Sequence, residues 1–200
     1  MGRLSLGKCD IGYGLRERLN RLEKEAIGRA AATLVESGQS VFIDAGTTAL
    51  EVARHLAKRA LTLNLITTSV KVSAELAGLP NLRVRQLGGD IYAQSFGVAG
   101  PETVAALSNL YLDWAFLGTA GVSVKTGLTN NNHTEVSVKR AAALRSSRTV
   151  FLADSSKLNR TALVQIADIT EPHTLLTTRK LSSGDAKGFR DRGWEVIIAD

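Results

Sequence analysis

The fold is decided by Val41-Phe42-Ile43-Asp44-Ala45-Gly46-Thr47-Thr48, where an apolar run ends in an aspartate, a glycine and two hydroxyl side chains. A helical pattern follows this run directly. A buried strand that ends in this way and then opens a helix presents free backbone N–H groups and the positive end of the helix dipole. Phosphate and carboxylate groups bind at such points. The stretch therefore predicts a small anionic ligand at the strand ends of an α/β sheet.

Strand-like and helix-like segments alternate along the rest of the chain. Apolar or alternating runs predict strands at 41–43, 63–67, 82–87, 112–117, 149–153, 175–178 and 195–199. Helical spacing predicts helices at 18–36, 48–58, 70–78, 101–110 and 133–146, the third of them capped by Ser69. In the first helix, Leu19, Leu22 and Ile27 are expected to face the core. The Gly-, Thr- and Asn-rich stretch 118–132 predicts a loop or a hairpin.

Strands separated by helices of this length imply βαβ units. The expected fold is therefore an α/β domain with an open, mainly parallel sheet and helices on both faces. At 200 residues, with no repeat and no linker in the sequence, the chain fits one domain.

Polar clusters follow five of the predicted strands. Alone, each could be ordinary turn and capping chemistry. In a parallel sheet, however, all five would lie at one edge, which favours a ligand pocket there. The clusters are Asp44-Ala45-Gly46-Thr47-Thr48, Thr67-Thr68-Ser69, Gly88-Gly89-Asp90, Gly118-Thr119-Ala120-Gly121 and Asp154-Ser155-Ser156-Lys157.

Composition and motifs exclude several kinds of function. Gly-x-Gly-x-x-Gly and P-loop motifs are missing, so neither a dinucleotide nor a P-loop nucleotide is expected. His55, His133 and His173 have no partners at ligand spacing, and Cys9 is the single cysteine, so we expect no metal and no other cofactor. The net charge of +6 could reflect an attraction to nucleic acid or phosphorylated metabolites, or only a scattered basic surface. No long Lys/Arg block appears, so direct DNA contact by this chain is not supported. No run spans a bilayer and no secretory signal is present, which favours the cytoplasm.

Glu135 and Lys139 lie four residues apart on the helix predicted at 133–146. They could form an ordinary surface ion pair of a few tenths of a kcal/mol. If this helix begins at the pocket, Lys139 could instead meet an anionic ligand or a carboxylate such as Asp44 or Asp113.

Six motifs, taken in order, resemble the effector-binding domain of DeoR-type bacterial transcriptional repressors. They are Asp44-Ala45-Gly46-Thr47-Thr48, Thr67-Thr68-Ser69, Leu87-Gly88-Gly89, Asp113-Trp114-Ala115-Phe116-Leu117-Gly118, Glu135-Val136-Ser137-Val138-Lys139 and Ala153-Asp154-Ser155-Ser156-Lys157. The resemblance extends from about residue 19 to residue 178. It implies a fold similar to ribose-5-phosphate isomerase and, as effector, a phosphorylated sugar or related metabolite.

The resemblance also raises the alternative of a sugar-phosphate isomerase. Such an enzyme needs a carboxylate base. Counting back from the Ala-Asp-x-Ser-Lys motif puts Lys139 where the isomerase has that base, and Phe116 stands where it has a second aspartate. A lysine there can hold an anion but is a poor base. A sensor is therefore favoured over an enzyme. A third reading, an interaction module with a vestigial pocket, predicts no affinity for sugar phosphates.

The resemblance further implies how the chain is organised and what it binds. We expect residues 1–18 to be a linker remnant or extension and residues 19–200 to be the effector domain. The DNA-binding helix-turn-helix of these repressors is not expected in this chain. Operator DNA would be contacted only through that missing N-terminal domain. A homodimer or homotetramer is expected. The residues expected to bind the effector are Asp44, Gly46, Thr47, Thr48, Thr68, Ser69, Gly88, Gly89, Asp113, Gly118, Gly121, Glu135, Lys139 and Lys157.

Overall fold

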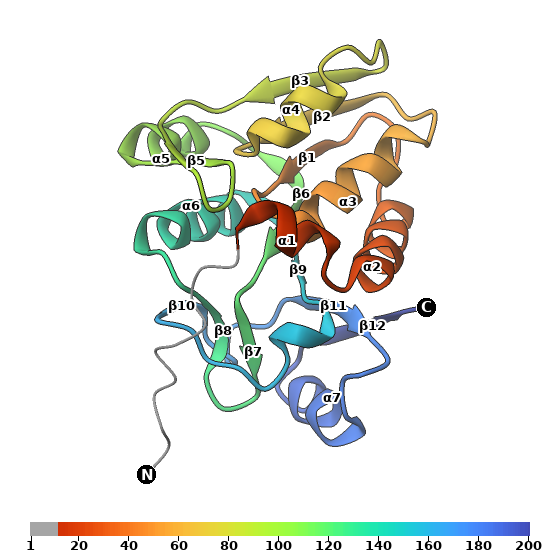
Figure 1. Cartoon of the computed structure of the whole chain (residues 1–200), viewed down its shortest axis with the longest axis vertical. Coiled ribbons are helices and arrows are strands. Elements are labelled where there is room, and N and C mark those ends of the chain that lie inside the picture. The colour runs from red at the N-terminus through yellow and green to blue at the C-terminus, as the bar shows by residue number, and fades with distance from the viewer. Residues whose placement is uncertain (1–11) are drawn as a thin grey trace.

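A seven-stranded parallel sheet forms the centre of the protein (Figure 1). The computed structural model describes residues 12–200, so the first part of the expected extension and Cys9 lie outside the described residues. The strand order is β12-β11-β9-β6-β1-β2-β3, and every pairing is parallel, as the sequence predicts. The strands are β1 (Ser40–Ile43), β2 (Leu63–Thr67), β3 (Leu82–Gln86), β6 (Leu112–Gly118), β9 (Ser146–Leu152), β11 (Thr174–Thr178) and β12 (Glu195–Ala199).

Helices cover both faces of this sheet because successive strand residues point to opposite sides. Val41 and Ile43 belong to the core formed with α2 (Arg21–Thr33), α3 (Thr47–Ala57) and α4 (Val70–Leu76). Phe42 points the other way, into the core formed with three further helices. These are α5 (Pro101–Ser108), α6 (His133–Leu144) and α7 (Ser183–Arg190). Figure 1 shows α2, α3 and α4 along one side and α5 and α6 along the other.

Two small antiparallel sheets complete the fold. Of the loop or hairpin predicted for 118–132, the structure shows the hairpin. It consists of β7 (Gly121–Ser123) and β8 (Gly127–Asn130), and β10 (Val164–Ala167) extends it. A second hairpin, β4 (Asp90–Tyr92) with β5 (Gly97–Ala99), was not predicted, and neither were β10 and α7. Three-residue strands such as β4, whose side chains are largely exposed, leave too short a pattern to detect.

The helix predicted at 18–36 is wrong at its start. Two helices stand there, α1 (Tyr13–Arg18) and α2, separated by Asn20 in the left-handed conformation with φ +52°. Asparagine tolerates this conformation better than most residues. Leu19 and Leu22, expected in the core, are 45% and 80% exposed, whereas Lys24 is buried. The Lys24 ammonium binds the carbonyl oxygens of Arg16 and Leu19 at the end of α1, a role that apolar periodicity does not reveal.

Gly28 sets how closely α2 approaches α3. A Cβ at this position would lie 2.6 Å from the carbonyl carbon of Glu51 and 2.8 Å from its Cβ. We expect Gly28→Ala to destabilise the domain by about 1–3 kcal/mol through overpacking against backbone, despite the better helix propensity of alanine. Gly14→Ala is the control, because Gly14 lies in α1 with nothing within 4 Å of the added carbon. Urea unfolding of both variants tests this, and equal stability would contradict it.

No helix among residues 12–200 is both long enough and apolar enough to cross a membrane.

Candidate functional site

The carboxyl ends of five adjacent strands gather the polar clusters predicted from the sequence. β9, β6, β1, β2 and β3 are neighbours in the sheet, and each is followed by one of those clusters or ends in it. From β1 the chain proceeds outward to β2 and β3 and then returns to β6 on the other side of β1. The strand order therefore reverses between β1 and β6, which is the point where open α/β sheets bind ligands.

Asp44 and Lys139 form a buried ion pair at this switch point. Asp44 follows β1, and its Oδ2 accepts a hydrogen bond of 2.8 Å from the N–H of Gly118 at the end of β6. The Lys139 ammonium, from α6, donates to the same oxygen. Both side chains are almost fully buried. Burial raises the pKa of the Asp44 carboxyl above its ordinary value, while Lys139 and the Gly118 N–H act in the opposite direction.

This pairing changes what Lys139 can do. The sequence leaves open whether its ammonium is on the surface, free for an anion or paired with Asp44, and the structure places it in the last of these arrangements. An ammonium already neutralised inside the protein offers little charge to a ligand. Its contact with Asp44 instead joins α6 to the end of β1.

The first turn of α3 offers backbone donors beside this pair. Gly46 stands at the N-cap with φ +147°, and no side chain caps the helix. Within residues 12–200, the N–H groups of Thr47 and Thr48 have no acceptor. Both threonines are nearly buried. N–H groups without an acceptor at a helix start, together with the helix dipole, form an anion site.

Glu135 lies one turn before Lys139 on α6 and is held from two sides. Its Oε1 accepts from the Ser95 hydroxyl at 2.6 Å, and its Oε2 accepts from the Asn130 amide at 3.0 Å. Asn132 caps the helix by accepting from the N–H groups of Thr134 and Glu135. Sequence reasoning missed Ser95 and Asn130. Asn130 stands in the polar stretch 118–132, which the sequence predicts as a loop or a hairpin. Ser95 belongs to the β4–β5 hairpin, which was not predicted.

Thr68 and Ser69 are deeply buried after β2 and serve the fold. The Ser69 hydroxyl accepts from the Val72 N–H and so caps α4, as predicted from the sequence. The Thr68 carbonyl accepts from the Val98 N–H of β5 at 2.8 Å. The second of these bonds attaches the β4–β5 hairpin to the loop that follows β2.

Two of the predicted glycines, Gly89 and Gly121, accommodate neighbouring segments of the chain itself. Gly89 has φ +137°, and a Cβ there would lie 2.5 Å from the Thr103 hydroxyl. That hydroxyl also donates to the Gly88 carbonyl at 2.6 Å. A Cβ at Gly121 would lie 2.6 Å from the Arg160 carbonyl oxygen. Close approach of the backbone is therefore required here by neighbouring segments.

The structure does not bring Asp113 to the other candidates. It lies near the start of β6, and its Oδ2 accepts from the Ser40 N–H at 2.8 Å at the start of β1. That is the amino edge of the sheet, the opposite edge from Asp44. Asp113 therefore serves strand pairing, and we leave it out of the candidate site.

Lys157 lies at the carboxyl edge in the short 3₁₀ helix η1 (Ser155–Lys157). Its ammonium donates no hydrogen bond to any residue in 12–200. Burial lowers the pKa of its ammonium, and the Arg16 charge acts in the same direction, while nearby Asp154 acts to raise it. Oδ1 of the Asp154 carboxylate accepts from the Ser156 N–H and the Asn20 amide. Lys157 is thus a partly buried cation available to a ligand.

Metal chemistry finds no support in the described part of the chain. Residues 12–200 contain no group of three or more histidine, cysteine, aspartate or glutamate side chains placed to hold an ion. Backbone donors, a buried ion pair and one available lysine at the switch point of the sheet are typical of a ligand site in an α/β domain.

Comparison with known proteins assigns the family. A model of the DeoR C terminal sensor domain matches residues 19–179. The chain is 32% identical over 189 residues to the uncharacterized HTH-type transcriptional regulator YulB of Bacillus subtilis (strain 168), covering 94% of this chain and 72% of that protein. It is 31% identical over 148 residues to the glycerol-3-phosphate regulon repressor of Escherichia coli (strain K12), covering 74% of this chain and 58% of the repressor. The chain belongs to the DeoR family of transcriptional regulators and carries its ligand-sensing domain.

Among solved structures, ribose 5-phosphate isomerase A from Methanocaldococcus jannaschii matches with a TM-score of 0.51 and 21% identity. The match covers 70% of this chain and 55% of the isomerase chain. At this identity the likeness shows the fold alone, and it confirms the isomerase-like architecture. The relatives identified by sequence are transcriptional regulators, so the chain is a regulatory domain and not an enzyme.

Proposed function

We propose that this domain binds a phosphorylated sugar or sugar-derived metabolite at the carboxyl edge of the sheet, between β1 and β6. The observation that carries the proposal is the uncapped first turn of α3, whose Thr47 and Thr48 N–H groups have no acceptor in the described chain. They would hold the phosphate, with Lys157 supplying positive charge. The relative named as a glycerol-3-phosphate regulon repressor supports a ligand of this class.

The acidic groups would recognise the sugar. Glu135 is a carboxylate fixed in place by Ser95 and Asn130, and each of its oxygens can accept more than one hydrogen bond. It can therefore accept from sugar hydroxyls. Asp44, neutralised by Lys139, would keep the end of β1 and the Gly118 backbone in position for the ligand.

We further propose that residues 19–200 form the sensing unit of a homo-oligomeric, cytoplasmic repressor. Ligand binding would alter DNA binding through a helix-turn-helix outside the residues matched to the sensor family. The HTH-type relatives, which this chain covers only in part, support that division of labour. Native mass spectrometry with and without ligand tests the oligomer, and a monomer in both conditions would contradict it.

A thermal-shift screen tests the ligand class. The panel contains sugar phosphates, sugar-alcohol phosphates and the unphosphorylated parent of each. A ligand at 100 times its Kd adds about 2.7 kcal/mol of stability, which raises the melting temperature measurably. A selective shift with a phosphorylated compound would support the proposal. No shift across the panel would indicate a vestigial pocket or a ligand outside the panel that carries no phosphate. Either result would contradict the proposal of a phosphorylated ligand.

Lys157 gives the binding a dependence on pH. Because burial lowers the pKa of its ammonium, this lysine loses its charge at a lower pH than an ordinary lysine. We expect affinity for the phosphorylated compound found in the screen to fall as the pH rises through that lowered pKa. Titration calorimetry across the alkaline range measures this. Lys157→Met should lose the dependence, whereas Lys125→Met, at an exposed lysine in the β7–β8 turn, should keep it.

A further inference from the structure

The turn of the β4–β5 hairpin touches the candidate site and helix α1 with consecutive residues. On one side, the Ser95 hydroxyl donates to Glu135 of the site at 2.6 Å. On the other side, the Arg16 guanidinium of α1 donates to the Gln94 carbonyl. The Phe96 ring meets the Tyr13 ring of α1 edge to face, with centroids 5.2 Å apart. Three successive residues thus connect an element of the site to the first described helix.

The end of this hairpin that adjoins the turn is fixed to the ligand-facing loops. A Cβ at Gly97 would lie 2.4 Å from the Ala45 Cβ, so the hairpin rests directly on the loop between β1 and α3. The Phe96 carbonyl accepts from the Val70 N–H at 2.9 Å, at the start of α4. A movement of either loop would therefore be passed to the turn.

Two features destabilise the contact between α1 and the turn. Phe96 has φ +49°, a conformation that a bulky non-glycine residue rarely adopts and that persists only where the surroundings enforce it. The Tyr13 hydroxyl is buried and has no hydrogen-bond partner among residues 12–200. A buried polar group without a partner weakens the docked state. The Lys71 ammonium lies over both rings, 5.1 Å and 5.3 Å from their centroids.

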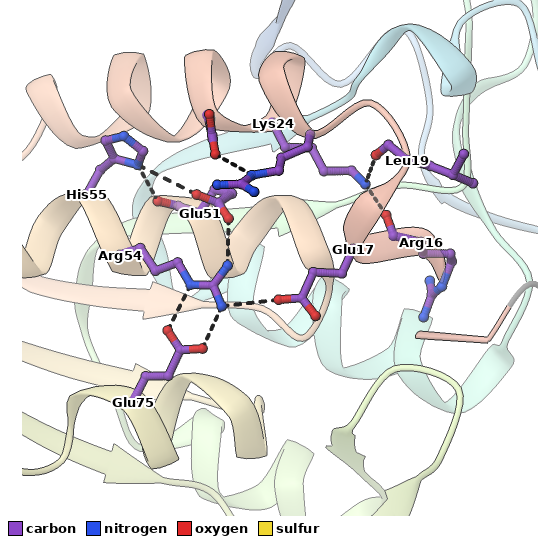
Figure 2. A network of polar contacts seen from close by, with 10 residues as sticks. Arg16, Glu17, Leu19, Lys24, Glu51, Arg54, His55 and Glu75 are labelled. Atoms are coloured by element: carbon purple, nitrogen blue, oxygen red, sulfur yellow. Dashed lines mark hydrogen bonds and ion pairs between the residues drawn. The ribbon is translucent and has the colours of Figure 1, made fainter. Parts of the chain in front are cut away.

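The other contacts of α1 are polar rather than part of a core. Arg54 of α3 pairs with Glu17 of α1 at 3.1 Å and with Glu51 and Glu75 at 2.7 Å. Figure 2 shows these three pairs. It also shows the Lys24 ammonium at the end of α1. Tyr13 is the single buried residue of this helix. An element with so little buried apolar surface can open locally without unfolding the domain.

We propose that the 93–96 turn couples occupancy of the sugar-phosphate site to the docking of α1. This rests on the proposed function. A ligand whose hydroxyls donate to Glu135 would fix the carboxylate that also accepts from Ser95. It would thereby stabilise the turn in its present position. The turn in turn holds Tyr13 and Arg16. Ligand therefore favours docked α1, the helix through which the chain enters the sensing domain.

Thermodynamic linkage makes the coupling reciprocal. If ligand binds the docked state more tightly by some factor, docking of α1 raises ligand affinity by the same factor. A ligand with equal affinity for both states would shift nothing. The coupling can therefore be detected from either end, including in the protein without ligand.

Hydrogen exchange of the α1 backbone, in the 200-residue chain without ligand, is the decisive measurement. Ser95→Ala removes the bond to Glu135 together with the weaker bonds of the same hydroxyl to the Gly97 N–H at 3.2 Å and the Tyr92 carbonyl at 3.4 Å. The substituted side chain does not itself touch α1. We expect this variant to speed exchange of the amides of residues 16–19 by about three- to tenfold. Ser182→Ala is the matched control, since it removes a 2.7 Å hydroxyl–carboxylate bond to Asp185 at α7. It should leave α1 exchange unchanged. Unchanged exchange in Ser95→Ala, or an equal rise in both variants, would overturn the coupling.

Two further measurements separate this inference from the proposed function. Tyr13→Phe removes the unpartnered hydroxyl and should slow exchange in α1, and faster exchange would count against the strained interface. Glycerol 3-phosphate, used as the probe, should slow α1 exchange in the wild-type chain and not in Ser95→Ala if it binds. Where no sugar phosphate binds, the proposed function fails while the ligand-free comparison still decides the coupling.

Discussion

Lys139→Met is expected to destabilise the domain by about 3–5 kcal/mol, the cost of removing one partner from a buried ion pair. The variant leaves the Asp44 carboxylate buried, with the Gly118 N–H as its remaining donor among the described residues. An isolated buried charge is far more costly than a neutral side chain of the same shape. Urea unfolding at neutral pH measures the loss.

A double variant and the pH dependence identify the charge as the cause. Asp44→Asn in the Lys139→Met background removes the unpaired charge and keeps an oxygen for the Gly118 N–H, so it should recover much of the loss. Without Lys139, the pKa of Asp44 rises further, because one of the causes that lowers it has gone. An acid with a raised folded-state pKa gains stability as the pH falls through that pKa. The deficit of the single variant should therefore shrink on acidification. A deficit independent of pH and of Asp44→Asn would indicate lost packing instead.

The elements that the sequence predicts well are those with long apolar patterns and clear ends. The strands at 63–67 and 195–199 coincide with β2 and β12, and Ser69 caps α4 where its position before a helical pattern indicates. These features are local, since neighbouring residues alone decide them. The alternation of strands and helices predicts parallel pairing of the strands. Parallel pairing then places the polar clusters at one edge of the sheet.

What the sequence does not reveal depends on contacts between distant residues. The roles of Asp44 and Asp113 differ because strand register decides which partner each carboxylate meets. Asp44 lies level with the end of β6, while Asp113 lies level with Ser40. The role of Ser95 depends on a hairpin of two three-residue strands. No periodicity within one segment carries that information. Tertiary contacts also explain why Lys24 is buried while Leu22 is exposed.

Gly46→Ala is expected to weaken binding of the sugar phosphate found in the screen by about ten- to a hundredfold, the loss of one or two charge-assisted hydrogen bonds. Gly46 has φ +147° with nothing within 4 Å of an added Cβ, so the substitution acts through the backbone alone. A side chain at this position forces the loop toward a different backbone conformation. Where the fold keeps the present conformation, the strain costs about 1–3 kcal/mol. The new conformation would turn the Thr47 and Thr48 N–H groups away from the phosphate.

Gly38→Ala separates this effect on the site from general loss of stability. Gly38 also has positive φ, +89°, and equally open surroundings, but it precedes β1 at the opposite edge of the sheet. Both variants should therefore lose stability by similar backbone strain, and calorimetry should find ligand affinity reduced in Gly46→Ala alone. Equal affinities in the two variants would mean that the phosphate is not held at the start of α3. Lys157 would then have to carry the anion, and the loss of affinity in Lys157→Met should be correspondingly larger.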